Sequence, residues 1–156
     1  MTSKDALKFF QSYINEMIDL GGKNLPKSIS TRLGAKLAKI YKKVGIDDVK
    51  IALIKSYEVL NSIPEIKRID EKTIEVKIKY EECFCPIGGD PNPDNPEKAK
   101  IIQDSICTPY TVGFINEFNP DFAYDGQVKE CILSSGSNTC RYILYLSDKQ
   151  NDGNND

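Results

Sequence analysis

Hydrophobic residues in the first third of the chain recur at the spacing of amphipathic helices. Ser3 can cap a first helix, and Gly21-Gly22 can end it. Its expected inner face carries Leu7, Phe10, Ile14, Met17 and Ile18. A second helix is predicted to begin at Ser28 or Ser30, with an inner face of Leu33, Leu37, Ile40, Tyr41 and Val44. A third, capped by Asp47 and ended by Pro64, carries Val49, Leu53, Tyr57 and Leu60.

The middle of the chain changes to the two-residue period of a β-strand. From Thr73 to Tyr80, apolar residues at even positions alternate with charged residues at odd positions, which is typical of a half-buried strand. The segment 66–69 can pair with it as a hairpin. Residues 85–96 hold two glycines and four prolines, so a loop is expected there.

The second half predicts a helix pair followed by another hairpin. Asn95-Pro96 begins one helix, and Thr108-Pro109 predicts a break or kink before a second helical stretch that ends at Asn119-Pro120. Residues 127–133 and 139–146 are the predicted strands, joined by a turn at 134–138. The stripe Tyr110, Phe114 and Phe118 is expected to meet the strand face Tyr142, Leu144 and Leu146, as ordinary core packing.

These patterns predict an α+β fold in one domain over residues 1–148, with a helical part at 1–64 and a mixed part at 65–148. The polar segment 149–156 is predicted to be a disordered tail. The length of 156 residues suits one domain with its own core.

Charge and hydropathy narrow the classes of partner. The chain has 21 basic and 23 acidic residues, so it lacks the positive field of a nucleic-acid-binding protein. Its longest apolar runs, 51–54 and 142–146, are too short to cross a bilayer. The first residues offer no apolar signal core, so a cytoplasmic location is expected.

The sequence contains no histidine. Serine and cysteine hydrolases lose their usual base without one, and zinc enzymes with histidine ligands are excluded. We therefore expect a binding protein rather than an enzyme, with no catalytic residues.

Five cysteines come from three parts of the chain and are the candidate metal ligands: Cys83, Cys85, Cys107, Cys131 and Cys140. Cys83 and Cys85 end the alternating strand and share a face, while Cys131 and Cys140 flank the last hairpin. Four sulfurs around one zinc ion form the structural site expected when no histidine is available. Which four would bind stays open.

Three alternatives remain for these thiols. An iron–sulfur cluster would use the same ligands, although the clustered ferredoxin spacing is absent. Buried cysteines can also be inert core residues. In the third alternative, Cys107 lies at a helix N-terminus, is activated as a thiolate there, and serves a redox sensor.

Residues of the second half resemble the 4-vinyl reductase domain. The matching segments are Cys107-Thr-Pro-Tyr110-Thr-Val-Gly113-Phe114, then Val128-Lys-Glu130-Cys131, then Gly136 and Cys140-Arg-Tyr142-Ile143. The resemblance covers roughly residues 66–148. The loop between Cys131 and Cys140 is about one residue longer than the family pattern, and Cys83-Phe-Cys85-Pro-Ile-Gly-Gly is similar to an archaeal subset.

The resemblance implies helices packed on a twisted antiparallel sheet, as in transport-particle subunits and haem-based nitric-oxide sensors. It also implies binding of a small, often hydrophobic molecule, and in some members a cysteine metal site. Haem binding does not carry over, because the chain has no histidine to ligate the iron. The reductase in the family name is no sign of activity here.

Together these observations predict a non-enzymatic sensor or binding domain. We expect a structural zinc site beside an apolar cavity for a small hydrophobic molecule, and a homodimer. The alternatives are a thiol-based redox sensor and a dimeric scaffolding subunit that binds no ligand. An enzyme with metal-bound water is a further alternative that four sulfur ligands would disfavour.

Overall fold

The computed structural model describes residues 3–148. The elements, in chain order, are α1 (Ser3–Gly21), α2 (Asn24–Lys43), α3 (Val49–Glu58), β1 (Ile63–Asp70), β2 (Thr73–Lys79), α4 (Pro96–Ile102), a π-helical turn η1 (Gln103–Cys107), α5 (Thr108–Phe118), β3 (Phe122–Glu130), α6 (Ile132–Ser135) and β4 (Thr139–Asp148). The predicted α+β fold, with helices, a hairpin, a helix pair and a second hairpin, is confirmed. The predicted tail at 149–156 lies outside the described residues.

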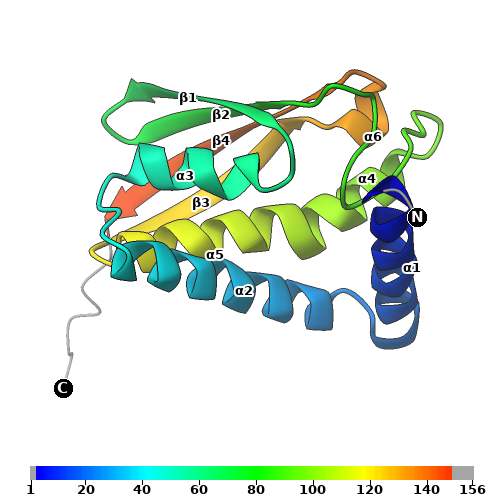
Figure 1. The fold of residues 1–156 in the computed structure, drawn as a ribbon, viewed down its shortest axis with the longest axis horizontal. Helices are drawn as coiled ribbons and strands as arrows, with labels where there is room; N and C mark the ends of the chain where they lie inside the picture. The colour runs from blue at the N-terminus through cyan, green and yellow to red at the C-terminus, as the bar shows by residue number, and fades with distance from the viewer. Residues whose placement is uncertain (1–2, 149–156) are drawn as a thin grey trace.

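The four strands form one antiparallel sheet in the order β1-β2-β4-β3. α3 and α5 lie against one face of the sheet, α2 runs beside α5 farther from the strands, and α1 crosses at one end (Figure 1). No helix within residues 3–148 combines the length and the apolar character needed to cross a bilayer.

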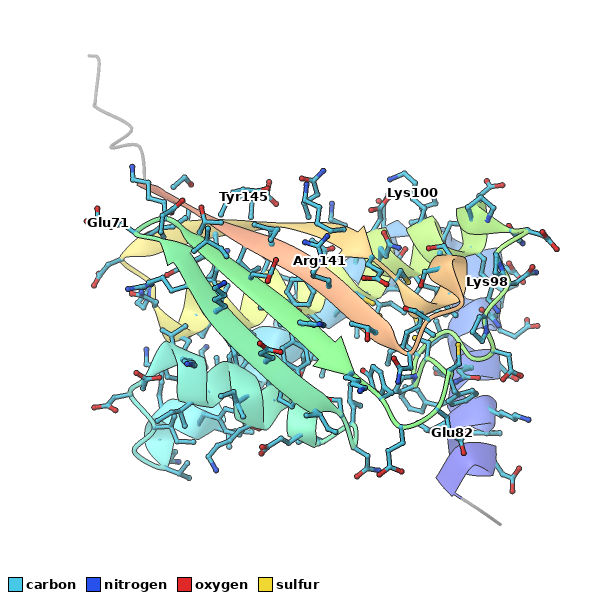
Figure 2. All side chains as sticks on the ribbon, turned by 90° about the horizontal axis from the view of Figure 1, so that it is seen from above. Glu71, Glu82, Lys98, Lys100, Arg141 and Tyr145 are labelled. Atoms are coloured by element: carbon cyan, nitrogen blue, oxygen red, sulfur yellow. The ribbon has the colours of Figure 1, made fainter. Side chains whose placement is uncertain are left out.

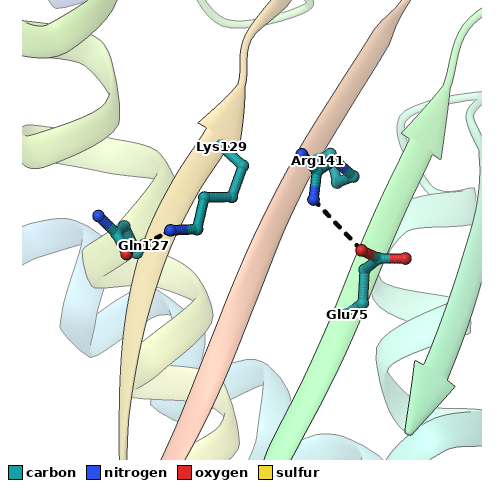
Figure 3. A network of polar contacts seen from close by, with 4 residues as sticks. All are labelled: Glu75, Gln127, Lys129 and Arg141. Atoms are coloured by element: carbon teal, nitrogen blue, oxygen red, sulfur yellow. Dashed lines mark hydrogen bonds and ion pairs between the residues drawn. The ribbon is translucent and has the colours of Figure 1, made fainter. Parts of the chain in front are cut away.

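The alternation of β2 orients the sheet as predicted. Ile74, Val76 and Ile78 are buried on the helix-covered face. The opposite face carries polar and charged side chains, seen from above in Figure 2. There the Arg141 Nη1 atom lies 3.2 Å from a Glu75 carboxylate oxygen, and the Lys129 Nζ atom donates to the Gln127 side chain at 2.7 Å (Figure 3). This face is therefore the solvent side of the sheet.

The inner face of α2 differs from the prediction. Its buried residues are small and recur at every fourth position: Pro26, Ser30, Gly34 and Ala38. Leu33, Ile40 and Val44, which were expected to face the core, are 52%, 57% and 68% exposed. The hydrophobic pattern of the sequence does not reveal this inner face, because small residues contribute little to it. Close packing of two helices nevertheless favours small residues.

Two glycines bring α2 and α5 into backbone contact. A Cβ atom on Gly34 would lie 2.8 Å from the Phe114 nitrogen and would also clash with the Tyr110 carbonyl oxygen. A Cβ atom on Gly113 would lie 2.9 Å from the Thr31 Cα atom. Side chains at either position would therefore force the two helices apart.

A π-helical turn replaces the break predicted at Thr108-Pro109. Pro109 has no N–H to donate to the carbonyl oxygen of Ser105, one turn earlier, so a regular α-helix is disfavoured at this point. The chain takes one π turn at Gln103–Cys107 and continues as α5 without leaving the helix. As predicted, Asn95 caps α4, accepting a hydrogen bond from the Lys98 amide at 3.4 Å.

Several predicted boundaries in the first half are wrong. α2 begins at Asn24 rather than at Ser28 or Ser30, because a proline at position 26 is tolerated in the first helical turn. Asp48, not Asp47, caps α3 and accepts from the Ile51 amide at 2.8 Å. α3 ends at Glu58, and Pro64 lies in the edge strand β1, where its missing N–H is acceptable.

The inner face predicted for α1 is wrong at one position. Phe10 is 60% exposed rather than buried.

The last hairpin also differs in detail. β3 begins five residues earlier than predicted and ends at Glu130. The segment Ile132–Ser135, expected to include the end of the strand, forms the helical turn α6 and stops at Gly136, whose φ is 69°. The turn buries Ile132 and Leu133, which explains why an apolar segment leaves the strand.

We predict that Gly34→Ala and Gly113→Ala each lower the free energy of unfolding by about 1–3 kcal/mol, because the added methyl group overpacks a backbone contact. Urea denaturation measures the change. Gly21→Ala is the matched control, since its Cβ atom would meet Leu25 at an ordinary 3.9 Å. Equal stability of all three variants and the wild type would contradict the role assigned to this contact.

Candidate functional site

A small cavity lies between α5 and the last two strands. Its volume is about 20 Å³, which is enough for one water molecule. The helix contributes Thr108, Thr111 and Val112 to its walls, and the strands contribute Gly126, Tyr142 and Leu144. The walls are therefore mostly apolar, with hydroxyl groups among them.

The hydroxyl group of Tyr142 is buried and has no hydrogen-bond partner among the described residues. The hydroxyls of Tyr57 and Thr111 pair with each other, 3.0 Å apart. The rings of Tyr57 and Tyr142 meet edge to face with centroids 6.1 Å apart. Because an unsatisfied buried hydroxyl costs about 1–3 kcal/mol, a ligand atom that bonded to it would remove that cost.

Gly126 leaves room at the wall of the cavity on β3. A Cβ atom there would lie 3.4 Å from Thr108 and 3.5 Å from Leu144 and Val112, all ordinary or nearly ordinary contacts. A glycine inside a strand loses packing, and it can mark a place where a ligand approaches closely. The missing side chain thus enlarges the cavity without a steric need for glycine.

Four of the five predicted metal ligands lie in one hydrophobic cluster next to this cavity. Cys85 and Cys131 are buried members of the cluster, and Cys107 and Cys140 pack against it. The Cys85 Sγ atom accepts a hydrogen bond from the Gly88 amide at 3.2 Å. Burial raises the pKa of the Cys85 thiol.

Cys83 stands apart from that cluster. It is exposed, and its thiol donates to the carbonyl oxygens of Gly136 at 2.9 Å and Ser137 at 3.0 Å. The predicted loop over residues 85–96 is confirmed as irregular. Cys83 thus ties the start of this segment to the turn before β4 through hydrogen bonds.

Cys131 and Cys140 form a thiol pair. The Cys140 thiol hydrogen-bonds to Cys131 and lowers the pKa of Cys131, with the Gln103 side chain adding to the effect. The same contact raises the pKa of Cys140, whose Sγ atom also accepts from the Ile132 amide at 3.4 Å. The pair therefore favours a thiolate at Cys131 and a thiol at Cys140.

Cys131 lies beside a surface hollow. It is buried, with an exposed fraction of 6%, and it helps line a hollow of about 410 Å³ together with Gln103, Lys129, Glu130 and Ser134. Cys107 lines the inner cavity instead.

The activation predicted for Cys107 is wrong. The helix continues through η1 into α5, so no free N-terminal amides point at this thiol. Burial raises the pKa of Cys107, and Cys85 and Cys131 add to the effect. Cys107 is therefore a neutral thiol.

As placed, the cysteines do not fit a zinc ion. Within residues 3–148 no group of three or more Cys, His, Asp or Glu side chains is positioned to hold a metal. The Cys83 thiol donates to carbonyl oxygens, and the free thiol of Cys140 hydrogen-bonds to Cys131. The cysteines converge as a cluster, but the zinc site itself stays a prediction.

The sequence indicated the two surfaces that meet at the core, and an apolar cavity was expected, but the residues that line the cavity were not identified. Phe114, Phe118 and Leu144 are buried together, as expected. The cavity uses the neighbouring stripe of Thr108, Thr111 and Val112, whose threonines did not stand out as apolar. Gly126 gave no signal either, because the predicted strand began at residue 127, whereas the structure places Gly126 inside β3.

Two solved structures share this fold. One is a trafficking protein particle complex subunit 3 from Naegleria fowleri covalently bound to palmitic acid, with a TM-score of 0.64 and 11% identity over 94% of this chain and 95% of that chain. The other is the phenol-responsive sensory domain of the transcription activator PoxR with phenol, with a TM-score of 0.51 and 10% identity over 93% of this chain and 74% of that chain. The predicted transport-particle-subunit-like fold is confirmed.

No family model matches the chain, and no curated protein matches it. At these identities the two structures establish the fold alone. Membership of the 4-vinyl reductase family stays a prediction.

We predict that Cys140→Ala raises the pKa of Cys131, because the variant removes the thiol that hydrogen-bonds to its thiolate. The ultraviolet absorbance of the thiolate, followed against pH, measures the change. In the wild type this thiolate adds stability that is present above the ordinary thiol pKa and is lost as the pH falls through the lowered one. Cys83→Ala, which leaves the pair intact, is the control, and an unchanged titration in Cys140→Ala would disprove the coupling.

Proposed function

We propose that this chain binds a small molecule with an apolar body and one hydrogen-bonding group, in the cavity between α5 and the sheet. The unpartnered hydroxyl of Tyr142 carries the proposal, since it is buried beside apolar walls with nothing among the described residues to satisfy it. Phenol and palmitic acid, which accompany the two structures of the same fold, each combine an apolar body with an oxygen.

The cavity must widen to accept such a ligand. Its volume of about 20 Å³ holds a water molecule, so a ring the size of phenol has to move the walls apart. Val112 and Val128 are only partly buried wall residues at the border of the cavity, and Gly126 adds no side chain.

The role that we propose is binding rather than catalysis. Burial raises the pKa of Cys107, the thiol in the wall of the cavity. This thiol therefore supplies no base near neutral pH.

We predict that phenol binds the wild type and binds Tyr142→Phe about two- to tenfold more weakly, which corresponds to one lost hydrogen bond. Toluene, which lacks the hydroxyl, should bind both proteins equally. Nuclear magnetic resonance titration measures each affinity. Tyr145→Phe, on the outer face of the same strand, is the matched control, because Tyr145 is 42% exposed.

Phenol affinity that is the same in Tyr142→Phe and the wild type would refute the role of this hydroxyl. Absence of binding by both phenol and toluene would refute the cavity as a site for small aromatic ligands.

Gly126→Ala should fill the cavity. We predict that it stabilises the ligand-free protein by about 0.4–1 kcal/mol, because alanine restricts the unfolded chain and makes ordinary contacts in the folded one. The same methyl group should weaken phenol binding. Thermal unfolding with and without phenol measures both effects, and a variant that binds phenol as well as the wild type would place the ligand elsewhere.

A thiol switch is a second candidate, favoured by the contact between Cys131 and Cys140 beside the surface hollow. The Cys131 thiolate would attack a hydroperoxide, forming a sulfenic acid and releasing an alcohol or water. The Cys140 thiol would then attack that sulfur, forming a disulfide and releasing water, so two thiols give two electrons to the peroxide.

We predict that hydrogen peroxide converts this pair to a disulfide, detected by peptide mass mapping as the loss of two hydrogen atoms. Cys140→Ala should stop at the sulfenic acid, and Cys83→Ala should react like the wild type. Retention of both free thiols would overturn the switch. Stoichiometric zinc in the purified protein, lost in Cys131→Ser, would favour the structural metal site instead.

A further inference from the structure

Helix α1 rests on the body of the protein through a narrow strip of its surface. Among residues 5–21, Gln11 and Ile14 are buried, and the other side chains are exposed or partly exposed. Ile14 packs in the hydrophobic cluster that also holds Cys85. A hollow of about 370 Å³ lies between α1 and α4. The helix thus covers the cluster with few buried side chains and leaves a gap at its flank.

The side chain of Gln11 forms a latch between α1 and the turn that begins at Cys85. Its Nε2 atom donates to the carbonyl oxygens of Cys85 at 3.2 Å and Pro86 at 3.1 Å. Gly89, with a φ of 87°, makes room for the latch, because a Cβ atom there would lie 3.0 Å from the Gln11 Oε1 atom. Two hydrogen bonds from one buried amide therefore fix α1 against this turn.

Cys85 lies beneath the latch. Its side chain is 7% exposed, and its backbone amide and carbonyl bond to Gly89 at 2.9 and 2.8 Å. On the side of α6, a Cβ atom at Gly88 would clash with Leu133, so the turn fits closely there as well. Burial also raises the pKa of the Cys85 thiol. The thiol is therefore both covered and protonated while α1 is in place.

The connection between α1 and α2 is suited to act as a hinge. It consists of Gly22 and Lys23. Gly22 has a φ of 70°, and a Cβ atom there would meet no described atom within 4 Å. α1 crosses the end of the molecule at a steep angle to α2 (Figure 1). Changes in the backbone dihedral angles of a short, loosely surrounded connection can swing one helix relative to the next.

We propose that α1 is a hinged lid over Cys85, held closed by Gln11 and opened by rotation about Gly22. Local opening of this kind moves the least firmly held element while the rest of the protein stays folded. When α1 swings out, Gln11 leaves the carbonyl oxygens of the turn, and solvent reaches the Cys85 thiol. A molecule that holds α1 away from the body therefore unmasks a reactive group. The lid is separate from the small-molecule cavity, whose walls come from α5, β3 and β4.

Thiol labelling of the full chain tests the lid. We expect iodoacetamide to modify Cys85 slowly, at a rate set by the fraction of molecules in which α1 is open. Gln11→Ala should raise this rate about tenfold or more, because it removes both hydrogen bonds of the latch. Ser12→Ala is the matched control, since the Ser12 hydroxyl donates to the Lys8 carbonyl oxygen within α1 at 3.1 Å. Peptide mass mapping follows each cysteine separately.

Two other cysteines serve as references in every sample. Cys83 is exposed and should react rapidly in all variants. Cys107 lines the inner cavity between α5 and the sheet, so its rate should be the same in Gln11→Ala and the wild type. An unchanged Cys85 rate in Gln11→Ala would overturn the lid. An equal rise at Cys85 and Cys107 would overturn it too, because global unfolding exposes both thiols.

The wild type provides a second test that needs no variant. Swinging out one helix exposes less surface than unfolding the whole chain, so labelling of Cys85 should depend on urea more weakly than labelling of Cys107. The rates are measured at urea concentrations below the unfolding transition. Equal urea dependence at the two cysteines would mean that both react through global unfolding, and the lid would be disproved.

Discussion

The backbone contact between α2 and α5 determines how the helical layer is built. With Gly34 and Gly113 facing the opposite helix, the two axes approach until main-chain atoms touch. The side of α2 toward α5 must then carry small residues. Leu37 and Tyr41 pack at the edge of the core, whereas Leu33, Ile40 and Val44 are left exposed. The same contact that joins the helices therefore creates an exposed apolar face.

The π-helical turn before α5 determines which side chains reach the sheet. One extra residue per turn shifts the register of every following position, and it is placed where Pro109 cannot complete an α-helical hydrogen bond. With this register Phe114 and Phe118 enter the core, stacked at 5.9 Å, while Thr108 and Thr111 face the strands. The threonine hydroxyls in the cavity wall thus follow from an irregularity that the proline favours.

Sequence patterns predicted the elements whose burial follows a simple period. The residues of β2 alternate because one face of the strand is buried and the other faces solvent, so its orientation could be inferred from Ile74 and Val76. The inner face of α2 could not be inferred in this way. Leu33 is more hydrophobic than Gly34 and therefore looks like the core residue, whereas the backbone contact with α5 requires the glycine. The cysteine cluster was foreseen as a convergence, but the pairing of Cys131 with Cys140 depends on the turn α6, which no local pattern indicated.

The cavity and the thiol hollow share a wall. Val128 on β3 borders both, with the cavity on the side of Tyr142 and the hollow on the side of Cys131. A ligand that widens the cavity by displacing Val128 therefore moves a wall of the hollow as well. Because β3 is an edge strand, paired only with β4 in the described sheet, this displacement breaks no second row of strand hydrogen bonds. As one of the two edge strands of the described sheet, β3 can therefore yield at less cost than the inner strands β2 and β4.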